Sequence, residues 1–338
     1  MEPSAPAGPP RVIIVKLSSL GDLFHALPAV HNLKAGLNAE IDWVTQPEYA
    51  DLVRCFSVAN RVIAFPRRGF LPQFPDFVSE LRGTQYDLAI DLQGLLKSAW
   101  VTRLARARRR IGPSYHREGA GLFYSSVAGK RDRTRHAVDQ ALDVVAHLGL
   151  PRVPVSFPVR FPERKVEGAR PRVALLPVSR WPSKNWPVQH FIDLAWRLRE
   201  RRACSLFILG GPADVEVCRE IEKALGPDVR NLAGTTNLVE MGAVLKEMDV
   251  LVANDSGPIH MAAAVGTPVV AIFGPTDPAR TGPYGARHRV IRAHLPCQPC
   301  YKRDCRKHGL ACLTSVQPEE VLAAVEKVLQ EKRATRGE

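Results

Sequence analysis

Short apolar runs recur along the chain, and each is followed by a polar or Gly-rich turn and then by apolar residues at helical spacing. Residues 12–17, 86–92, 173–177 and 250–253 are such runs. Runs of this length between turn residues are typical of buried parallel strands. Because the strands alternate with helices, the pattern predicts an α/β fold with parallel, doubly wound sheets.

A cluster of prolines divides this pattern into two halves. The five prolines lie between residues 151 and 171, and the alternation restarts after them. A chain of 338 residues also suits two domains of ordinary size. We expect a disordered tail at 1–10, Rossmann-like domains at 11–160 and 161–316, and a C-terminal helix at 317–338.

Composition places the chain among globular proteins and points to an acidic partner. Hydrophobic residues make up 45% and charged residues 24% of the chain, and the formal net charge is +13. Residues 97–135 alone hold eleven basic and two acidic residues, a formal net charge of +9. This stretch favours a phosphorylated lipid or an anionic membrane leaflet. A nucleic acid partner is a second interpretation, although no zinc-finger, RRM or KH pattern accompanies the charge. A third interpretation is that these residues form a solvated surface with no partner.

Nothing at the start of the chain is typical of a secretion signal. The first ten residues hold four prolines and no apolar run. The longest apolar stretch, 261–273, is interrupted by Gly266 and Pro268 and is too short to span a bilayer. We therefore expect a cytoplasmic protein.

The strongest candidate for a ligand site lies in residues 249–278. An apolar run ends at the sequence NDSGP, and a helix and a second apolar run follow. Asp255 or Ser256 can cap that helix, and Pro258 fits its first turn. A helix N-terminus at the carboxyl ends of parallel strands favours an anion or a nucleotide. Asp-Ser-Gly by itself is also a common structural cap.

A second candidate loop, SSLGD at residues 18–22, follows the first apolar run. Asp22 lies there near the start of a helix, where a carboxylate can simply interact with the helix dipole. The loop after residues 86–92 also ends a strand, so Gln93 and Lys97 become candidates for contacts to a substrate. Gly210 and Gly211 lack the GxGxxG spacing, which argues against NAD.

Four of the seven cysteines lie within sixteen residues: Cys297, Cys300, Cys305 and Cys312. His308 lies among them as a further possible ligand. Such a cluster in a cytosolic protein favours a structural zinc or iron site over disulfides. The spacing differs from that of an ordinary zinc ribbon, so four reduced thiols remain the alternative.

Two longer strings resemble the signatures of the ADP-heptose:lipopolysaccharide heptosyltransferases, the inverting glycosyltransferase family 9. They are VIIVKLSSLGDLFHALPAV at 12–30 and NDSGPIHMAAAVGTPVVAIFGPTDP at 254–278, and the resemblance extends over residues 11–328. The SSLGD form is most like the heptosyltransferase I branch, whereas the cysteine cluster is more typical of heptosyltransferase II and other branches. In some relatives a similar cluster binds iron. The family implies a GT-B fold, in which two Rossmann-like domains face a cleft and the C-terminal helix packs back on the first domain.

The resemblance also implies the reaction and the residues that carry it. Heptose would pass with inversion from ADP-heptose to a Kdo sugar of the lipopolysaccharide inner core. Asp22 would be the base that takes the acceptor proton, and Lys184 would neutralise the donor phosphates. The expected donor-binding residues are Ser179, Asp214, Thr236, Asp255, Ser256, Gly257 and His260. The expected acceptor-binding residues are Ser18, Ser19, Gly21, Gln93, Lys97, Arg103 and Arg110.

The resemblance also implies particular contacts for several of these residues. The backbone N–H groups of Asp255, Ser256 and Gly257 would bind the pyrophosphate, and Asp214 would accept the ribose hydroxyls. His260 would either hydrogen-bond a phosphate or pack in the core. Because no DxD motif is present, we expect no catalytic metal or other catalytic cofactor.

The expected partners are ADP-heptose, Kdo-lipid A or a lipopolysaccharide core, and the inner leaflet of the inner membrane, to which the protein would bind peripherally. No nucleic acid partner is expected. Three alternatives remain. The protein could transfer heptose to the first heptose, as heptosyltransferase II does, or it could heptosylate a protein. It could also be a non-enzymatic binder of nucleotide or lipopolysaccharide.

Overall fold

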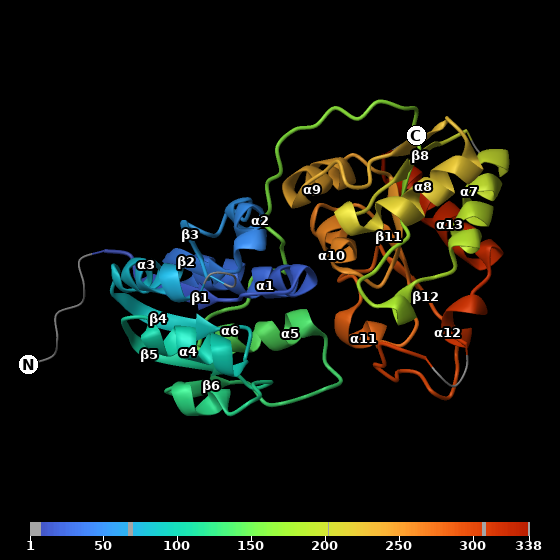
Figure 1. Ribbon diagram of the computed structural model, residues 1–338. Coiled ribbons are helices and arrows are strands. Elements are labelled where there is room, and N and C mark those ends of the chain that lie inside the picture. The colour runs from blue at the N-terminus through green and yellow to red at the C-terminus, as the bar shows by residue number, and fades with distance from the viewer. Residues whose placement is uncertain (1–7, 67–69, 202, 306–308, 337–338) are drawn as a thin grey trace, which may run out of the picture. The chain divides into compact units, whose positions relative to one another are not determined.

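The computed structural model describes residues 8–66, 70–201, 203–305 and 309–336. Most of the expected tail, and His308, lie outside these residues. The chain divides into two compact units, Met1–Arg160 and Phe161–Glu338 (Figure 1). Each unit is described separately below.

The first unit is a six-stranded parallel sheet with helices on both faces (Figure 1). Its strands are β1 (Arg11–Val15), β2 (Glu40–Thr45), β3 (Arg61–Ala64), β4 (Tyr86–Asp91), β5 (Ala107–Pro113) and β6 (Ser126–Ala128). Its α-helices are α1 (Leu20–Leu37), α2 (Ala50–Arg54), α3 (Phe70–Arg82), α4 (Leu96–Leu104), α5 (Ala137–Ala141) and α6 (Asp143–His147), and its 3₁₀ helices are η1 (Pro47–Tyr49) and η2 (Ala120–Phe123).

The strand order in this sheet is β3-β2-β1-β4-β5-β6. One face packs on α3 and α4, where Phe77, Leu81 and Val101 meet Val15 and Ala89 in a buried core. Helices α1, α5 and α6 contact one another, and α6 also contacts β5 and β6. Because β1 and β4 are central and parallel, their carboxyl ends lie side by side, with Val15 in register with Asp91.

The second unit repeats this architecture with a sheet of order β12-β11-β10-β7-β8-β9. Its strands are β7 (Arg172–Leu176), β8 (Ser205–Ile208), β9 (Val229–Asn231), β10 (Val250–Asn254), β11 (Val269–Ile272) and β12 (Arg289–Ile291). Its α-helices are α7 (Val188–Arg201), α8 (Val215–Leu225), α9 (Leu238–Lys246), α10 (Gly257–Ala264), α11 (Pro278–Thr281), α12 (Ala311–Thr314) and α13 (Pro318–Arg336), and its 3₁₀ helices are η3 (Pro182–Lys184) and η4 (Pro212–Asp214).

The predicted α/β architecture of two parallel, Rossmann-like sheets is confirmed. The apolar runs become fully buried strands because both faces of each sheet are covered. Every residue of β10, for example, is buried. Helices cover these faces because a parallel connection has to cross over the sheet.

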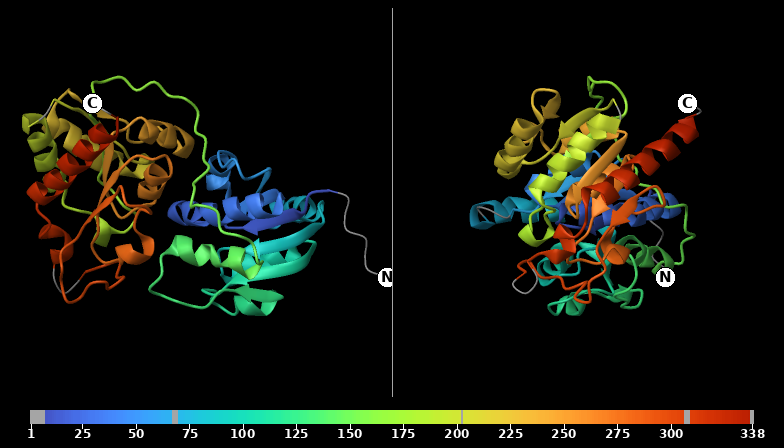
Figure 2. Two further views of the ribbon diagram at one scale, coloured as in Figure 1. Left: turned by 180° about the vertical axis from the view of Figure 1, so that it is seen from behind. Right: turned by 90° about the vertical axis from the view of Figure 1, so that its right-hand side faces the viewer.

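The C-terminal helix α13 packs within the second unit. It lies beside α7 and contacts β10, β11 and β12 (Figure 2). Val325 and Leu329 of this helix belong to the buried core of that unit, together with Trp186. The apolar side of α13 is therefore used inside the second unit, and its expected packing on the first domain stays a prediction.

Candidate active site

Asp22 lies in the first turn of α1, at the carboxyl edge of the first sheet. Its Oδ2 accepts hydrogen bonds from the backbone N of Ser19 at 2.9 Å and from Ser19 Oγ at 2.8 Å. His25 Nδ1 lies 3.8 Å from Asp22 Oδ1. The Asp22 side chain is nevertheless 43% exposed, so a substrate can reach it.

A buried lysine lies close to this carboxylate. Lys16, just beyond β1, is 6% exposed, and its Nζ donates to the carbonyl of Leu92 at 2.8 Å. Partial removal from water would raise the pKa of Asp22, but the charge of Lys16 and the interactions with His25 and Ser19 lower this pKa far below its usual value. Asp22 is therefore an anion at neutral pH. The burial of Lys16 lowers its own pKa, and the charges of Asp22 and Asp91 oppose that shift.

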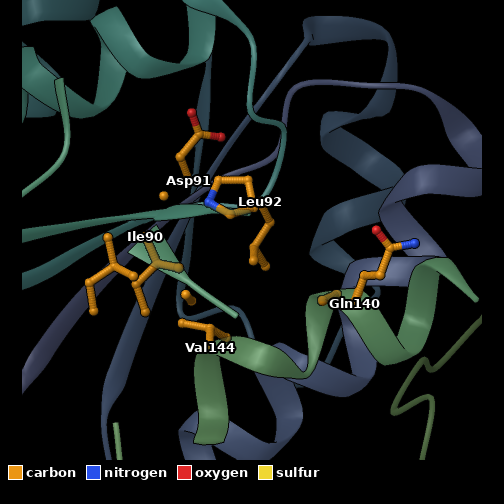
Figure 3. Close-up of a pocket in the computed structure, with 10 residues that line it drawn as sticks. Ile90, Asp91, Leu92, Gln140 and Val144 are labelled. Carbon is orange, nitrogen blue, oxygen red and sulfur yellow. The ribbon is translucent and has the colours of Figure 1, made fainter. Parts of the chain in front are cut away.

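The end of β4 supports the loop that carries Asp22. Figure 3 shows the Asp91 carboxylate directed away from Ile90 and Val144. Asp91 is fully buried, accepts hydrogen bonds from the backbone of Gln93 and Gly94 at 2.7 and 3.0 Å, and accepts one from Tyr124 Oη at 2.7 Å. Burial raises the pKa of Asp91, and these hydrogen bonds oppose the shift.

Gln93 links this turn to the SSLGD loop. Its Oε1 accepts hydrogen bonds from the backbone N of Leu17 at 3.2 Å and of Ser18 at 3.1 Å. The side-chain oxygen of Gln93 therefore already holds the loop in place. This structural role competes with the predicted contact between Gln93 and the acceptor. Ser18, Ser19 and Gly21 belong to the same loop and helix start as Asp22, as expected.

Of the three predicted basic acceptor residues, Lys97 lies near this edge and the two arginines do not. Lys97 is exposed at the start of α4, with its ammonium 5.3 Å from the ring centre of Phe65. Arg103 lies in the last turn of α4, at the opposite end of that helix. Arg110 lies within β5 and donates to the carbonyl of Ala105. The structure thus separates Arg103 and Arg110 from the carboxyl edge where Asp22 lies.

In the second unit, Lys184 and Asp255 form an ion pair. Lys184 Nζ lies 2.6 Å from Asp255 Oδ2, and their side chains are only 16% and 7% exposed. Thr276 Oγ1 donates to the same carboxylate oxygen. Lys184 Nζ also lies 4.7 Å from the ring centre of Trp181. The ammonium is fixed at the carboxyl edge of the second sheet.

Two asparagines hold the loop that carries Lys184. Asn185 Oδ1 accepts a hydrogen bond from the backbone N of Ser179 at 2.7 Å. The fully buried Asn254 accepts from the backbone N of Trp186 at 3.0 Å and donates to the carbonyl of Pro177 at 2.6 Å. Ser179 Oγ donates to the carbonyl of Asp255. The end of β7 and the end of β10 are therefore tied into one rigid edge.

The N-terminus of α10 follows directly. Ser256 is its N-cap residue but makes no side-chain capping hydrogen bond, and its Oγ is buried without a partner among the residues that the structure describes. One expectation is corrected here: the backbone N–H of Asp255 already donates to the carbonyl of Ile272, so it is not available for a phosphate. Asp255 instead acts through its side chain, which positions Lys184.

The remaining predicted donor residues lie at the same sheet edge or on α10. Asp214 ends η4 after β8, and its Oδ2 accepts the backbone N–H of Gly211 at 2.8 Å. Thr236 follows β9, and its Oγ1 is buried without a partner among the described residues. His260 is buried on α10.

The four clustered cysteines line one cavity of about 530 Å³, together with Ser183 and Arg303. Burial raises the pKa of Cys312, and the neighbouring Cys300, Cys305 and Cys297 raise it further. Across the described ranges, however, no three His, Cys, Asp or Glu side chains are arranged to hold a metal ion. The predicted zinc or iron site is therefore not supported, and His308 lies outside the described residues.

Several residues that matter here were not predicted from the sequence. They are Lys16, Asp91, Tyr124, Asn185, Asn254 and Thr276. Asp91, Asn185 and Thr276 hydrogen-bond the predicted Gln93, Ser179 and Asp255. Lys16, Tyr124 and Asn254 instead hold the strand ends and turns beside the predicted residues. Lys16 was the one available signal, because it interrupts the apolar run 12–17 and a charged residue in a buried segment is unusual unless it is paired.

The two edges offer complementary chemistry. The first holds a partly exposed carboxylate that is kept ionised, which is what a general base requires. The second holds a fixed ammonium beside a helix N-terminus with a free cap residue, which is what a diphosphate requires.

Comparison with known proteins agrees with this chemistry. The family model described as glycosyltransferase family 9 (heptosyltransferase) matches residues 76–311. The chain is 29% identical to lipopolysaccharide heptosyltransferase 1 of Pseudomonas aeruginosa, over 94% of this chain and 98% of that protein. It is 32% identical to lipopolysaccharide heptosyltransferase 2 of Escherichia coli K12, over 96% and 100% of the two chains. The structure of E. coli heptosyltransferase WaaC with ADP superposes with a TM-score of 0.77 at 27% identity, covering 95% of this chain and 99% of that one.

Proposed function

The chain belongs to glycosyltransferase family 9, and from this premise we propose that it transfers L-glycero-D-manno-heptose from ADP-heptose to a Kdo sugar of the lipopolysaccharide inner core, with inversion at the anomeric carbon. The observation that carries the proposal is the Asp22 carboxylate, which is partly exposed, held by Ser19 and kept ionised beside the buried Lys16.

In the proposed reaction, a hydroxyl oxygen of the acceptor attacks the anomeric carbon of the heptose. The new C–O bond forms as the bond from that carbon to the β-phosphate oxygen breaks, and ADP leaves. Asp22 takes the hydroxyl proton through Oδ1, because its Oδ2 already accepts two hydrogen bonds from Ser19. Ser19 fixes the orientation of the carboxylate, which limits the positions from which it can accept the proton.

Negative charge develops on the leaving diphosphate, and the second unit supplies the groups that stabilise it. Lys184 offers an ammonium that Asp255 and Thr276 hold in place before the donor arrives. Ser256 Oγ and the backbone N–H groups of Ser256 and Gly257, at the N-terminus of α10, are the proposed partners of the phosphate oxygens. Asp214, Thr236 and Ser179 lie along the same edge, and we assign them to the ribose and sugar of the donor.

The choice of a Kdo acceptor depends on the SSLGD loop rather than on overall similarity. The listed relatives include heptosyltransferases of both types, at 29% and 32% identity, so identity does not separate a Kdo acceptor from a first-heptose acceptor. We choose the Kdo acceptor because the loop that carries Asp22 has the form of the first type.

Such an acceptor is a membrane lipid, so the protein has to work at a bilayer surface. Within the residues that the structure describes, no helix is long and apolar enough to cross a membrane. We propose peripheral binding to the inner leaflet of the inner membrane.

The test is ADP release from ADP-heptose, measured with and without Kdo-lipid A, for the wild-type protein and for Asp22→Ala. Asp51→Ala is a matched control, because Asp51 is an exposed carboxylate on another helix of the same unit. We expect release that requires the acceptor, that is lost in Asp22→Ala and that is kept in Asp51→Ala.

Other outcomes would contradict parts of the proposal. Release only with a heptosylated core would move the acceptor to the first heptose, and release only with a polypeptide would move it to protein. Turnover by Asp22→Ala at the wild-type rate would refute the role of this base. Absence of ADP-heptose binding would refute the function.

A further inference from the structure

Three exposed apolar side chains lie within or beside the most basic stretch of the chain. Leu122 in η2 is 90% exposed, more than any other large hydrophobic residue in the described part of the chain. Leu96 and Val127 are 46% and 37% exposed. Single exposed apolar residues are ordinary, but a group of them among like charges indicates an interaction surface.

Leu96 and the segment before η2 are joined by hydrogen bonds. The Glu118 carboxylate accepts the backbone N–H of Leu96 at 3.2 Å, and the backbone N–H of Arg117 donates to the carbonyl of Gly94 at 2.8 Å. Helix η2 also contacts α4. The protruding Leu122 therefore stands on the α4 side of the sheet.

Val127 lies on the same side. It is in register with Gly112, and a Cβ at Gly112 would come within 2.0 Å of the ring of Tyr124, the residue that follows η2. Because residues in register on neighbouring strands face the same side of a sheet, Val127 faces the side on which Tyr124 packs. The edge strand β6 thus adds its exposed side chain to the face formed by α4 and η2.

Cations surround these apolar residues. Lys97 and Arg103 lie on α4 and Arg117 precedes η2, and all three are exposed. Among the described residues, none of the three has a carboxylate within 4.0 Å, whereas many other arginines of the chain form ion pairs. Burial lowers the pKa of Arg110, and the charge of Arg103 lowers it further. Within the described ranges, these three cations therefore have no ion-pair partner.

We propose that this basic-apolar surface, composed of Leu96, Leu122, Val127, Lys97, Arg103 and Arg117, docks the protein on an anionic lipid bilayer. Leu122 enters the boundary between headgroups and acyl chains, and the cations lie against the lipid phosphates. Charge complementarity and the protruding apolar tip together favour a bilayer over a nucleic acid, which has no apolar layer to receive Leu122. The inference rests on the proposed function for its choice of a lipid-borne acceptor.

The surface is also joined to the proposed base. Tyr124, next to η2, donates to Asp91 at 2.7 Å, and Asp91 fixes the turn at Gln93, which in turn accepts the backbone N–H of Ser18. Docking through η2 would therefore set the position of the SSLGD loop relative to the headgroup layer. Under this proposal Arg103 and Arg110 are not contacts to the acceptor sugar, and the first of them binds the membrane that holds the acceptor.

The experiment is co-sedimentation of the full chain with vesicles of phosphatidylcholine, with or without about 30% phosphatidylglycerol. It compares the wild type with Leu122→Asp and with the double variant Arg103→Glu/Arg117→Glu. Val290→Asp is the control for placing a carboxylate at an exposed apolar residue outside this surface, because Val290 is 38% exposed and belongs to the second unit. Lys223→Glu, an exposed position on α8, controls for the added negative charge.

We expect binding that requires the anionic lipid and weakens with added salt. Leu122→Asp should lower the vesicle-bound fraction about tenfold and the double charge variant by at least as much, while both controls bind as the wild type does. Leu122 is so exposed that its substitution leaves folding intact, and unchanged melting temperatures would verify this. Turnover of a delipidated, water-soluble acceptor should be unchanged in Leu122→Asp, whereas turnover of the vesicle-embedded acceptor should fall.

Vesicle binding is measured without substrate, so its outcome is separate from that of the proposed function. If vesicles bind through Leu122 but no heptose is transferred, the surface stands and the function fails. Equal binding by Leu122→Asp and wild type, or no binding to anionic vesicles, overturns the surface. So does binding of single-stranded RNA in place of vesicles, or a Leu122-dependent dimer in sedimentation velocity.

Discussion

The two units share a strand order but differ in the chemistry at their carboxyl edges. Read from β9, the second sheet runs β9-β8-β7-β10-β11-β12, which corresponds strand by strand to β3-β2-β1-β4-β5-β6 in the first. In the first unit the proposed base, Asp22, follows the first strand, on α1. In the second unit the helix N-terminus with a free cap residue follows the fourth strand, on α10. The strand order therefore fixes the edge at which a site forms, but not the loop that carries it.

The two helix N-termini explain why one unit suits the anionic donor and the other suits the hydroxyl of the acceptor. The first turn of α1 holds its own carboxylate, because Asp22 accepts the N–H of Ser19, so an incoming anion would meet a negative charge there. The N-cap of α10 makes no such bond, and Lys184 adds a positive charge next to it. An anionic donor thus favours the second unit, and a hydroxyl that has to lose a proton favours the first.

The largest expected effect is at Asp22. Asp22→Asn keeps the size of the side chain but removes the base, and we expect turnover to fall by about 10³-fold. ADP should bind as tightly as before, since the donor edge belongs to the other unit. Steady-state kinetics and ADP calorimetry check both parts, and a matching loss of ADP affinity would contradict the division between the units.

Lys184→Met should act on the donor side with a comparable effect. It removes the phosphate-neutralising charge and leaves the buried Asp255 without its cation, so we expect weaker ADP-heptose binding and a loss of about 3 kcal/mol in stability. The double variant Lys184→Met/Asp255→Asn separates these effects, because it removes the unpaired charge. Stability should return in the double variant while binding stays weak, as calorimetry and thermal melts can show; recovery of binding would exclude a direct role for Lys184.

Lys16→Met tests how the first unit keeps its base ionised. Without this cation the pKa of Asp22 should rise, so the acidic limb of the kcat/KM profile should move to higher pH. The depressed pKa of Asp22 contributes stability above the unfolded-state pKa of about 3.9, and this stability is lost as the pH falls toward the folded-state pKa. The variant should therefore lose less stability than the wild type between about pH 5 and pH 3. An unchanged acidic limb would show that Lys16 is only structural.

The smallest effect is expected at Ser256. Its Oγ makes no hydrogen bond among the described residues, so Ser256→Ala should leave the melting temperature nearly unchanged. If the hydroxyl meets a donor phosphate, ADP-heptose affinity should fall by about fivefold to tenfold. A variant that melts earlier but binds normally would make Ser256 a helix cap and not a ligand group. Calorimetry and thermal denaturation on one preparation decide between the two.

The sequence by itself determined the fold class and most of the residues at the two edges. Parallel strands show as continuous apolar runs because both of their faces are buried, so residues 12–17 and 250–253 could be assigned without a structure. The loops after those runs lie at the carboxyl edge by topology alone, which brought Asp22 and Ser256 forward as candidates. The resemblance in the same loops then indicated the reaction.

Only the tertiary structure decided what these residues do there, because their partners come from distant parts of the chain. Lys16 meets the carbonyl of Leu92, and Lys184 meets Asp255. The sequence also could not show that the N–H of Asp255 is consumed by the sheet, or that Arg103 lies at the far end of its helix from Asp22. Periodicity reports which side of an element is buried, whereas pKa, hydrogen bonding and free charge depend on contacts between elements far apart in the chain.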